Sequence, residues 1–130
     1  MTDKAAVPHT AHTGDSADNA VLLRGRVTTA PVARELPSGT VISVFRISVP
    51  RARTSMTAGS TQAVDWVDCT AWSARCRRTV SGWEVGDHVE LTGALRRRFV
   101  RAGPGSTRLE VEVLSARRAS KREPPAQAAT

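Results

Sequence analysis

The 130-residue sequence has no tyrosine, only two cysteines, and no apolar run of the roughly 18 residues that a membrane helix needs. Cys69 and Cys76 are too few for the disulfide framework of a small secreted domain. The first 19 residues lack the apolar segment of a secretory signal. We therefore expect a protein of the reducing cytoplasm with no membrane segment.

The sequence also offers little for catalysis or metal binding. It contains no glycine-rich phosphate loop, no nucleophile elbow and no pair of acids in a shared context. Cys69, Cys76 and His88 supply at most three zinc ligands and lack the close CxxC spacing of zinc sites. We therefore predict that the protein is not an enzyme and has neither a metal site nor a cofactor.

The charge is strongly biased towards arginine. The chain has 19 basic and 12 acidic residues, a net charge of +7 and a pI near 11.2, and its only lysines are Lys4 and Lys121. Such a balance favours a polyanionic partner, either nucleic acid or an anionic membrane surface. A GC-rich genome also replaces lysine by arginine, so the excess of arginine does not decide the function alone.

Periodic apolar patterning is confined to the middle of the chain. Residues 1–19 have none, and residues 119–130 carry a proline pair and no large apolar side chain. We therefore predict a disordered leader (1–19), one domain (20–118) and a disordered tail (119–130).

Within the domain, alternating apolar residues predict β-strands. The first pattern stops at Ala30-Pro31, and the fourth places Val89, Leu91, Gly93 and Leu95 towards the core. A polar, basic loop is expected between the second and third strands. The strands are predicted at residues 21–29, 40–49, 63–72, 87–101 and 107–116.

One short helix is predicted between the third and fourth strands. Ser73 can cap it, and it runs through Val80 with Cys76 facing the core. Trp83 continues this spacing and is predicted to be a core residue. Three strands, one short helix and two further strands in about 100 residues fit the five-stranded Greek-key barrel of the OB-fold. The predicted class is therefore all-β.

The candidate binding residues lie on the third strand and in arginine-rich segments. Alternation places Val67, Cys69 and Ala71 on the core face, which leaves Trp66 and Trp72 facing outward. Exposed aromatic rings can stack on any base. Arginines beside them can contact a phosphate backbone. The candidate set for single-stranded DNA is Trp66, Trp72, Phe99, Arg46, Arg51, Arg53, Arg96 and Arg98.

Five sequence blocks together resemble the bacterial single-stranded DNA-binding (SSB) protein family. They are NAVLLRGRVTTAPVAREL, SGTVISVFRISVPR, VDWVDCTAW, GDHVELTGALRRR and RLEVEVLSARR, in that order between residues 19 and 118. The resemblance implies an OB-fold and assembly as a homotetramer or homodimer. It also implies cytoplasmic, nucleoid-associated action in DNA replication, recombination and repair.

The resemblance assigns roles to individual residues. Trp66 and Trp72 match stacking aromatics of the family. Phe99 lies near a third but one position early relative to Gly93, which turns it to the inner face unless a bulge intervenes and leaves Val100 outward. Asp68 places an acid between the two outward tryptophans, where a neutral or basic residue would suit a phosphate better.

The C-terminal end departs from the family pattern. Family members end in an acidic, aromatic-containing tip that recruits replication proteins, whereas KREPPAQAAT has neither feature. The sequence therefore resembles a short or paralogous member without such recruitment. The main hypothesis is sequence-independent binding of single-stranded DNA. The alternatives are a primosome-type or structural OB-fold module for protein interactions with weak nucleic-acid binding, and a preference for RNA.

Overall fold

The structure is a computed structural model that describes residues 18–99 and 105–120. Its strands form one closed barrel in the order β1-β2-β3-β5-β4, and a single helix lies between β3 and β4 in the chain. This confirms the predicted OB-type barrel. The elements are β1 (Val21–Glu35), β2 (Val41–Pro50), β3 (Val64–Ala71), α1 (Ala74–Val80), β4 (His88–Phe99) and β5 (Thr107–Ser120).

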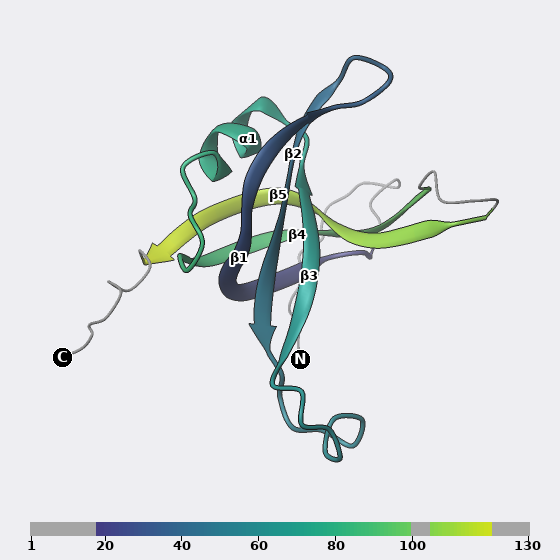
Figure 1. The fold of residues 1–130 in the computed structure, drawn as a ribbon, viewed down its shortest axis with the longest axis vertical. Coiled ribbons are helices and arrows are strands. Elements are labelled where there is room, and N and C mark those ends of the chain that lie inside the picture. The colour runs from purple at the N-terminus through teal and green to yellow at the C-terminus, as the bar shows by residue number, and fades with distance from the viewer. Residues whose placement is uncertain (1–17, 100–104, 121–130) are drawn as a thin grey trace.

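Closure of the barrel depends on β1, which pairs with two strands. Its first part pairs with β4, from Val21 to Arg26, and its second part pairs with β2, from Arg26 to Glu35. The remaining seam is a short parallel ladder between β3 and β5. Figure 1 shows β1 curving from one half of the barrel into the other.

The prediction that Ala30-Pro31 ends the first strand is wrong. β1 continues through both residues to Glu35, and its register with β2 shifts between Val27 and Thr29 and again between Thr29 and Val32. Proline is tolerated at such an irregularity because a residue there need not donate a hydrogen bond to the ladder.

The core is formed by inward residues of all five strands together with Cys76 and Val80 of α1 and with Trp83. Ser73 caps the helix by accepting a hydrogen bond from the Cys76 backbone amide, as predicted, and Cys76 and Val80 are buried. Trp83 is also buried, as predicted. Its ring meets Phe45 of β2 edge-to-face, with ring centroids 5.5 Å apart. An edge-to-face pair of this kind adds about 0.5–1.5 kcal/mol beyond the buried area.

The hairpin of β4 and β5 extends past the barrel. Val89, Leu91 and Gly93 are buried as predicted, but Leu95 is 47% exposed, so its prediction as a core residue is wrong. Leu95 pairs with the buried Val111 and thus has the core-side orientation. It is exposed because β4 and β5 extend past the end of the barrel at this point.

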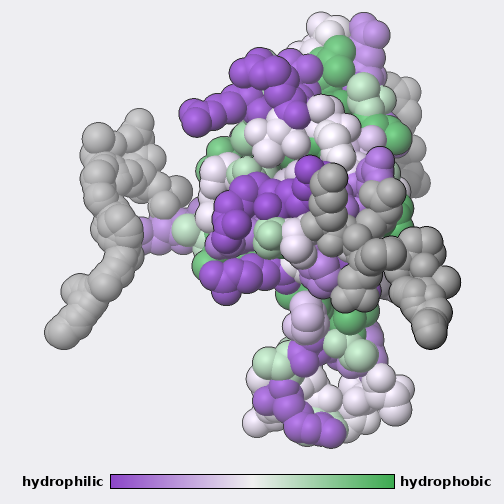
Figure 2. Space-filling model, turned by 90° about the vertical axis from the view of Figure 1, so that its left-hand side faces the viewer, coloured by the Kyte–Doolittle hydropathy of each residue, from purple (hydrophilic) through white to green (hydrophobic). Residues whose placement is uncertain are grey.

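Three arms project from the barrel (Figure 1). The β1–β2 turn forms one arm, the long β2–β3 connection forms the second, and the β4–β5 hairpin forms the third. The β2–β3 arm is mostly hydrophilic or neutral in Figure 2. Over residues 18–99 and 105–120, no helix is long and apolar enough to cross a membrane.

We expect Gly25→Ala to destabilise the protein by about 1–3 kcal/mol, because overpacking against a fixed group has this cost. A Cβ atom at Gly25 would overlap the backbone carbonyl of Ser48, where β1 leaves β4 for β2. Gly82→Ala is the control, since a Cβ atom there meets nothing within 4 Å. Urea unfolding of both variants measures the difference, and equal stability would contradict the proposed close packing.

Candidate nucleic-acid interface

The outer faces of β2 and β3 form a continuous surface that carries Trp66. Trp66 is directly opposite Ser48, and Asp68 is directly opposite Arg46. Cross-strand partners share one face of a sheet, so these residues all face outward. The Trp66 side chain is 69% exposed, which leaves its ring free to meet a ligand. The outward orientation predicted for Trp66 is thus present in the structure.

Trp72 follows the last residue of β3 and is held by a chain of polar contacts. Its indole Nε1 donates to the Thr70 hydroxyl (3.3 Å), which donates to the carboxylate of Glu110 (3.2 Å). Arg98 Nε pairs with the same carboxylate at 3.1 Å. Trp72 is 38% exposed, so part of its ring is accessible while its polar edge is fixed. Thr70 and Glu110, which both belong to this chain of contacts, are buried.

Asp68, which seemed unfavourable from the sequence, links two arginines. Its carboxylate lies 2.9 Å from Arg46 Nε and 3.8 Å from Arg108 Nη1. Two guanidinium groups therefore surround a single acid, and the local charge is positive. Asp68 orders the two cationic groups on the face that carries Trp66.

A groove of about 270 Å³ runs over this surface. It lies between the far part of β1, the outer faces of β2 and β3, and the β4–β5 hairpin. Within the described part of the chain, the side chain of Arg34 has no hydrogen bond or ion pair, so it is the groove arginine most open to an anion. The charged lining residues are Arg34, Arg46, Asp68, Arg98, Arg108 and Glu110.

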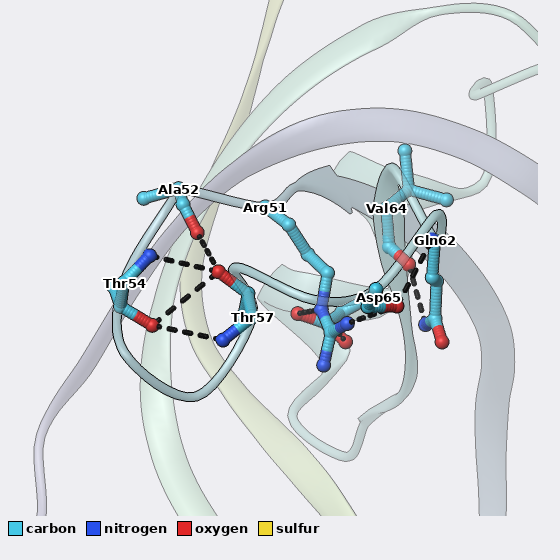
Figure 3. A network of polar contacts seen from close by, with 8 residues as sticks. Arg51, Ala52, Thr54, Thr57, Gln62, Val64 and Asp65 are labelled. Atoms are coloured by element: carbon cyan, nitrogen blue, oxygen red, sulfur yellow. Dashed lines mark hydrogen bonds and ion pairs between the residues drawn. The ribbon is translucent and has the colours of Figure 1, made fainter.

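Two further candidate arginines, Arg51 and Arg53, lie in the β2–β3 arm. Arg51 pairs with Asp65 across the base of the arm, with Arg51 Nε 3.1 Å from Asp65 Oδ1 (Figure 3). Arg53 Nη1 donates to the Ala58 carbonyl at 3.0 Å. The arm is held further by mutual hydrogen bonds of Thr54 and Thr57. Arg51 thus has a structural partner, whereas Arg53 has no carboxylate partner in the described part of the chain.

Arg96 and Phe99 lie on opposite faces of the β4–β5 hairpin. Arg96 pairs with Glu112 at 3.0 Å on the outer face. Between Gly93 and Phe99 the register with β5 is uninterrupted, so Phe99 has the inward orientation of Gly93 and Leu95. It is nonetheless 78% exposed, because the hairpin has left the barrel. The structure therefore does not bring Phe99 together with Trp66 and Trp72, and Val100 lies outside the described residues.

Sequence reasoning missed four residues of this surface. Thr70 and Glu110 support Trp72, while Arg34 and Arg108 add positive charge to the groove. The alternation in RLEVEV places Glu110 on one face with Glu112 and was the available signal for it. Nothing in the sequence showed that β5 lies parallel to β3, which is what brings Glu110 to Thr70.

The two cysteines are buried and free. Burial raises the pKa of the Cys69 thiol to about 12, and the nearby charges of Asp68 and Glu110 act in the same direction. The thiol thus stays protonated and unreactive at neutral pH. In residues 18–99 and 105–120, no group of three or more His, Cys, Asp or Glu residues is arranged to hold a metal ion.

An OB barrel with an outward tryptophan and surrounding guanidinium groups defines the class of oligonucleotide-binding barrels. A sequence model of the Single-strand binding protein family matches residues 18–119, and the chain belongs to that family. This confirms the resemblance seen in the sequence. The family consists of DNA-binding proteins that are not enzymes, which agrees with the prediction that the chain is not an enzyme.

Two solved structures share the fold. The small single-stranded DNA-binding protein from Streptomyces coelicolor superposes with a TM-score of 0.59 at 23% identity, over 78% of this chain and 94% of that one. The mitochondrial single-stranded DNA binding protein Rim1 of S. cerevisiae superposes with a TM-score of 0.63 at 9% identity, over 81% and 97%. No curated protein matches the sequence.

We expect Cys69 to resist alkylation by iodoacetamide in the folded protein, even at pH 9, because its thiol remains protonated below about pH 12. Because burial disfavours the thiolate in the folded protein, this group leaves the free energy of unfolding unchanged below the unfolded-state pKa near 9 and lowers it as the pH rises from there towards 12. Mass spectrometry of peptides from native and urea-unfolded protein measures the labelling. Rapid labelling of Cys69 in the native protein would contradict its burial.

Proposed function

We propose that the protein binds single-stranded DNA without sequence specificity, with bases stacked on Trp66 and phosphates held by arginines of the adjoining groove. The observation that carries this proposal is the 69% exposed Trp66 ring on the outer face of β3, beside guanidinium groups of β2 and β5. Every base has a π-face, so such a platform accepts any sequence. Membership in the family of single-strand binding proteins supports the same function.

Trp66 and Trp72 contribute differently in this proposal. Trp66 offers an open ring, whereas Trp72 is partly covered and held at its polar edge through Thr70. A fixed ring loses less conformational freedom when a base stacks on it. Trp72 therefore supplies a smaller but preorganised platform at the end of β3.

The arginines of the groove, of the β2–β3 arm and of the β4–β5 hairpin act mainly through their net positive field. Arg46, Arg96 and Arg98 each have a carboxylate partner, so a phosphate must compete with an existing ion pair. Arg34 and Arg53 have none in the described part of the chain and are the more available direct phosphate ligands. Because the ion pairs hold the guanidinium groups in place, the positive surface exists before DNA arrives.

We further propose that the protein acts as a homodimer or homotetramer in the cytoplasm, at the nucleoid, in replication, recombination or repair. Exposed Leu22 and Leu114 on the β1–β4–β5 side of the barrel support self-association, since exposed apolar side chains gain from burial. The ion-paired state of the arginines favours a second candidate, a protein-interaction OB module with weak nucleic-acid binding.

We expect Trp66→Ala to weaken binding of a poly-thymidine oligonucleotide by ~1–3 kcal/mol, the range for one stacked base. The fold should remain intact because the ring is exposed. Fluorescence anisotropy of a labelled oligonucleotide measures the affinity. Met56→Ala is the control, since Met56 is an exposed apolar side chain on the β2–β3 arm. An equal effect of both variants, or none, would remove the stacking mechanism and favour the interaction module.

We also expect the affinity for single-stranded DNA to fall steeply with salt. Each phosphate that an arginine neutralises releases counterions and contributes about 0.7 to the slope of log K against log salt for a single strand. Titrations across a range of NaCl concentrations give this slope, with a duplex of equal length as a control for general charge attraction. A flat response would count against phosphate contacts in the groove.

A further inference from the structure

A second cavity, of about 420 Å³, lies where β1 bends away from β2 towards β4. Its lining includes Arg24, Arg26, Ser48, Pro50, Val64 and His88. Figure 1 shows the bend of β1 at this corner. None of the binding residues predicted from the sequence lies in its lining.

The corner cavity is continuous with the face that carries Trp66. His88 is directly opposite Arg26, Arg26 is directly opposite Ser48, and Ser48 is directly opposite Trp66. One cross-strand row therefore runs over β4, β1, β2 and β3 with all four side chains on the outer surface. Because adjacent strands are about 4.8 Å apart, Arg26 lies roughly 10 Å along this row from Trp66. A few nucleotides of extended single strand cover such a span.

Positive charge in the corner exceeds the acids that could neutralise it. In contrast to Arg46, Arg98 and Arg108 of the groove, Arg26 has no carboxylate partner among the described residues. Arg24 shares the single carboxylate of Glu90 with Arg117, with Arg24 Nη2 3.6 Å from Glu90 Oε2. Two guanidinium groups thus share the carboxylate of Glu90, and Arg26 adds a positive charge that no carboxylate of the described residues pairs with. The resulting field attracts an anion.

The contact made by Arg26 is one that a phosphate can replace. Arg26 Nη2 lies 3.2 Å from His88 Nε2. A guanidinium group only donates, so the histidine nitrogen is the acceptor. A phosphate oxygen is a charged acceptor, and hydrogen bonds to charged acceptors are about twice as strong as those to neutral ones. An arriving phosphate therefore gains from Arg26 without breaking an ion pair.

We propose that the corner cavity is a second phosphate-binding subsite that continues the single-stranded DNA path from Trp66 across β2 onto β1, with Arg26 as its principal ligand. The inference rests on the proposed function and extends it to a part of the barrel outside the groove. The ligand class is the phosphodiester backbone of a single strand. Binding there is independent of the base, since the row between Trp66 and Arg26 presents only the Ser48 hydroxyl.

The test compares Arg26→Gln with Arg78→Gln, which removes the same charge from the exposed side of α1. Poly-thymidine oligonucleotides of about 4 and about 16 nucleotides are the limits of site size for one OB-fold. They distinguish binding around Trp66 alone from binding along the path that extends to Arg26. For the longer oligonucleotide, we expect Arg26→Gln to lower the salt slope by about 0.7. Arg78→Gln should not change it, and the short oligonucleotide should not distinguish the variants.

Arg26→Lys keeps the charge and should retain most of the salt slope, which separates phosphate binding from a folding defect. Thermal unfolding and light scattering of each variant accompany the titrations. An unchanged slope in Arg26→Gln, an equal loss in Arg78→Gln, or a change of oligomeric state in place of the slope would overturn the subsite. Wild-type protein that binds no oligonucleotide would instead overturn the proposed function itself.

Discussion

The close approach of β1 to the carbonyl of Ser48 at Gly25 underlies both the barrel and its binding surface. Next to this point, at Arg26, β1 stops pairing with β4 and begins pairing with β2, and a side chain at residue 25 would overlap backbone atoms. The barrel closes because one strand serves both halves. The same bend places Arg26 and His88 in one row with Ser48 and Trp66, so the shape of the binding surface follows from closure.

Acids on the outer face organise the positive charge and reduce its availability at the same time. Asp68 positions Arg46 and Arg108, and Glu110 connects Arg98 through Thr70 to Trp72. Ion pairs at a partly exposed surface are individually worth little stability, typically ~0–1 kcal/mol. Their effect here is geometric, since they fix where guanidinium groups and an indole ring lie. Uncompensated charge is left at Arg34, at the β2–β3 arm and in the corner of β1.

Several elements could be predicted because local patterns dictate them. The alternation in VDWVDCTAW places Trp66 outward and Cys69 inward, and Ser73 has the chemistry of a helix cap, all of which the structure has. Other features could not. Ala30-Pro31 lies inside β1 because a register shift accommodates it, and Leu95 is exposed because its hairpin leaves the barrel. Both depend on neighbouring strands that the local sequence does not specify.

The sequence by itself determined the OB class, the family resemblance, the outward tryptophan and the excess of arginine, because periodicity and composition are properties of the chain alone. Only the tertiary structure decided which arginines are ion-paired, that no bulge between Gly93 and Phe99 turns Phe99 outward, and that Arg26 lies in a row with Trp66. These outcomes depend on strand register and on the parallel pairing of β3 with β5. Contacts between residues distant in sequence are fixed by barrel closure, which no single segment encodes.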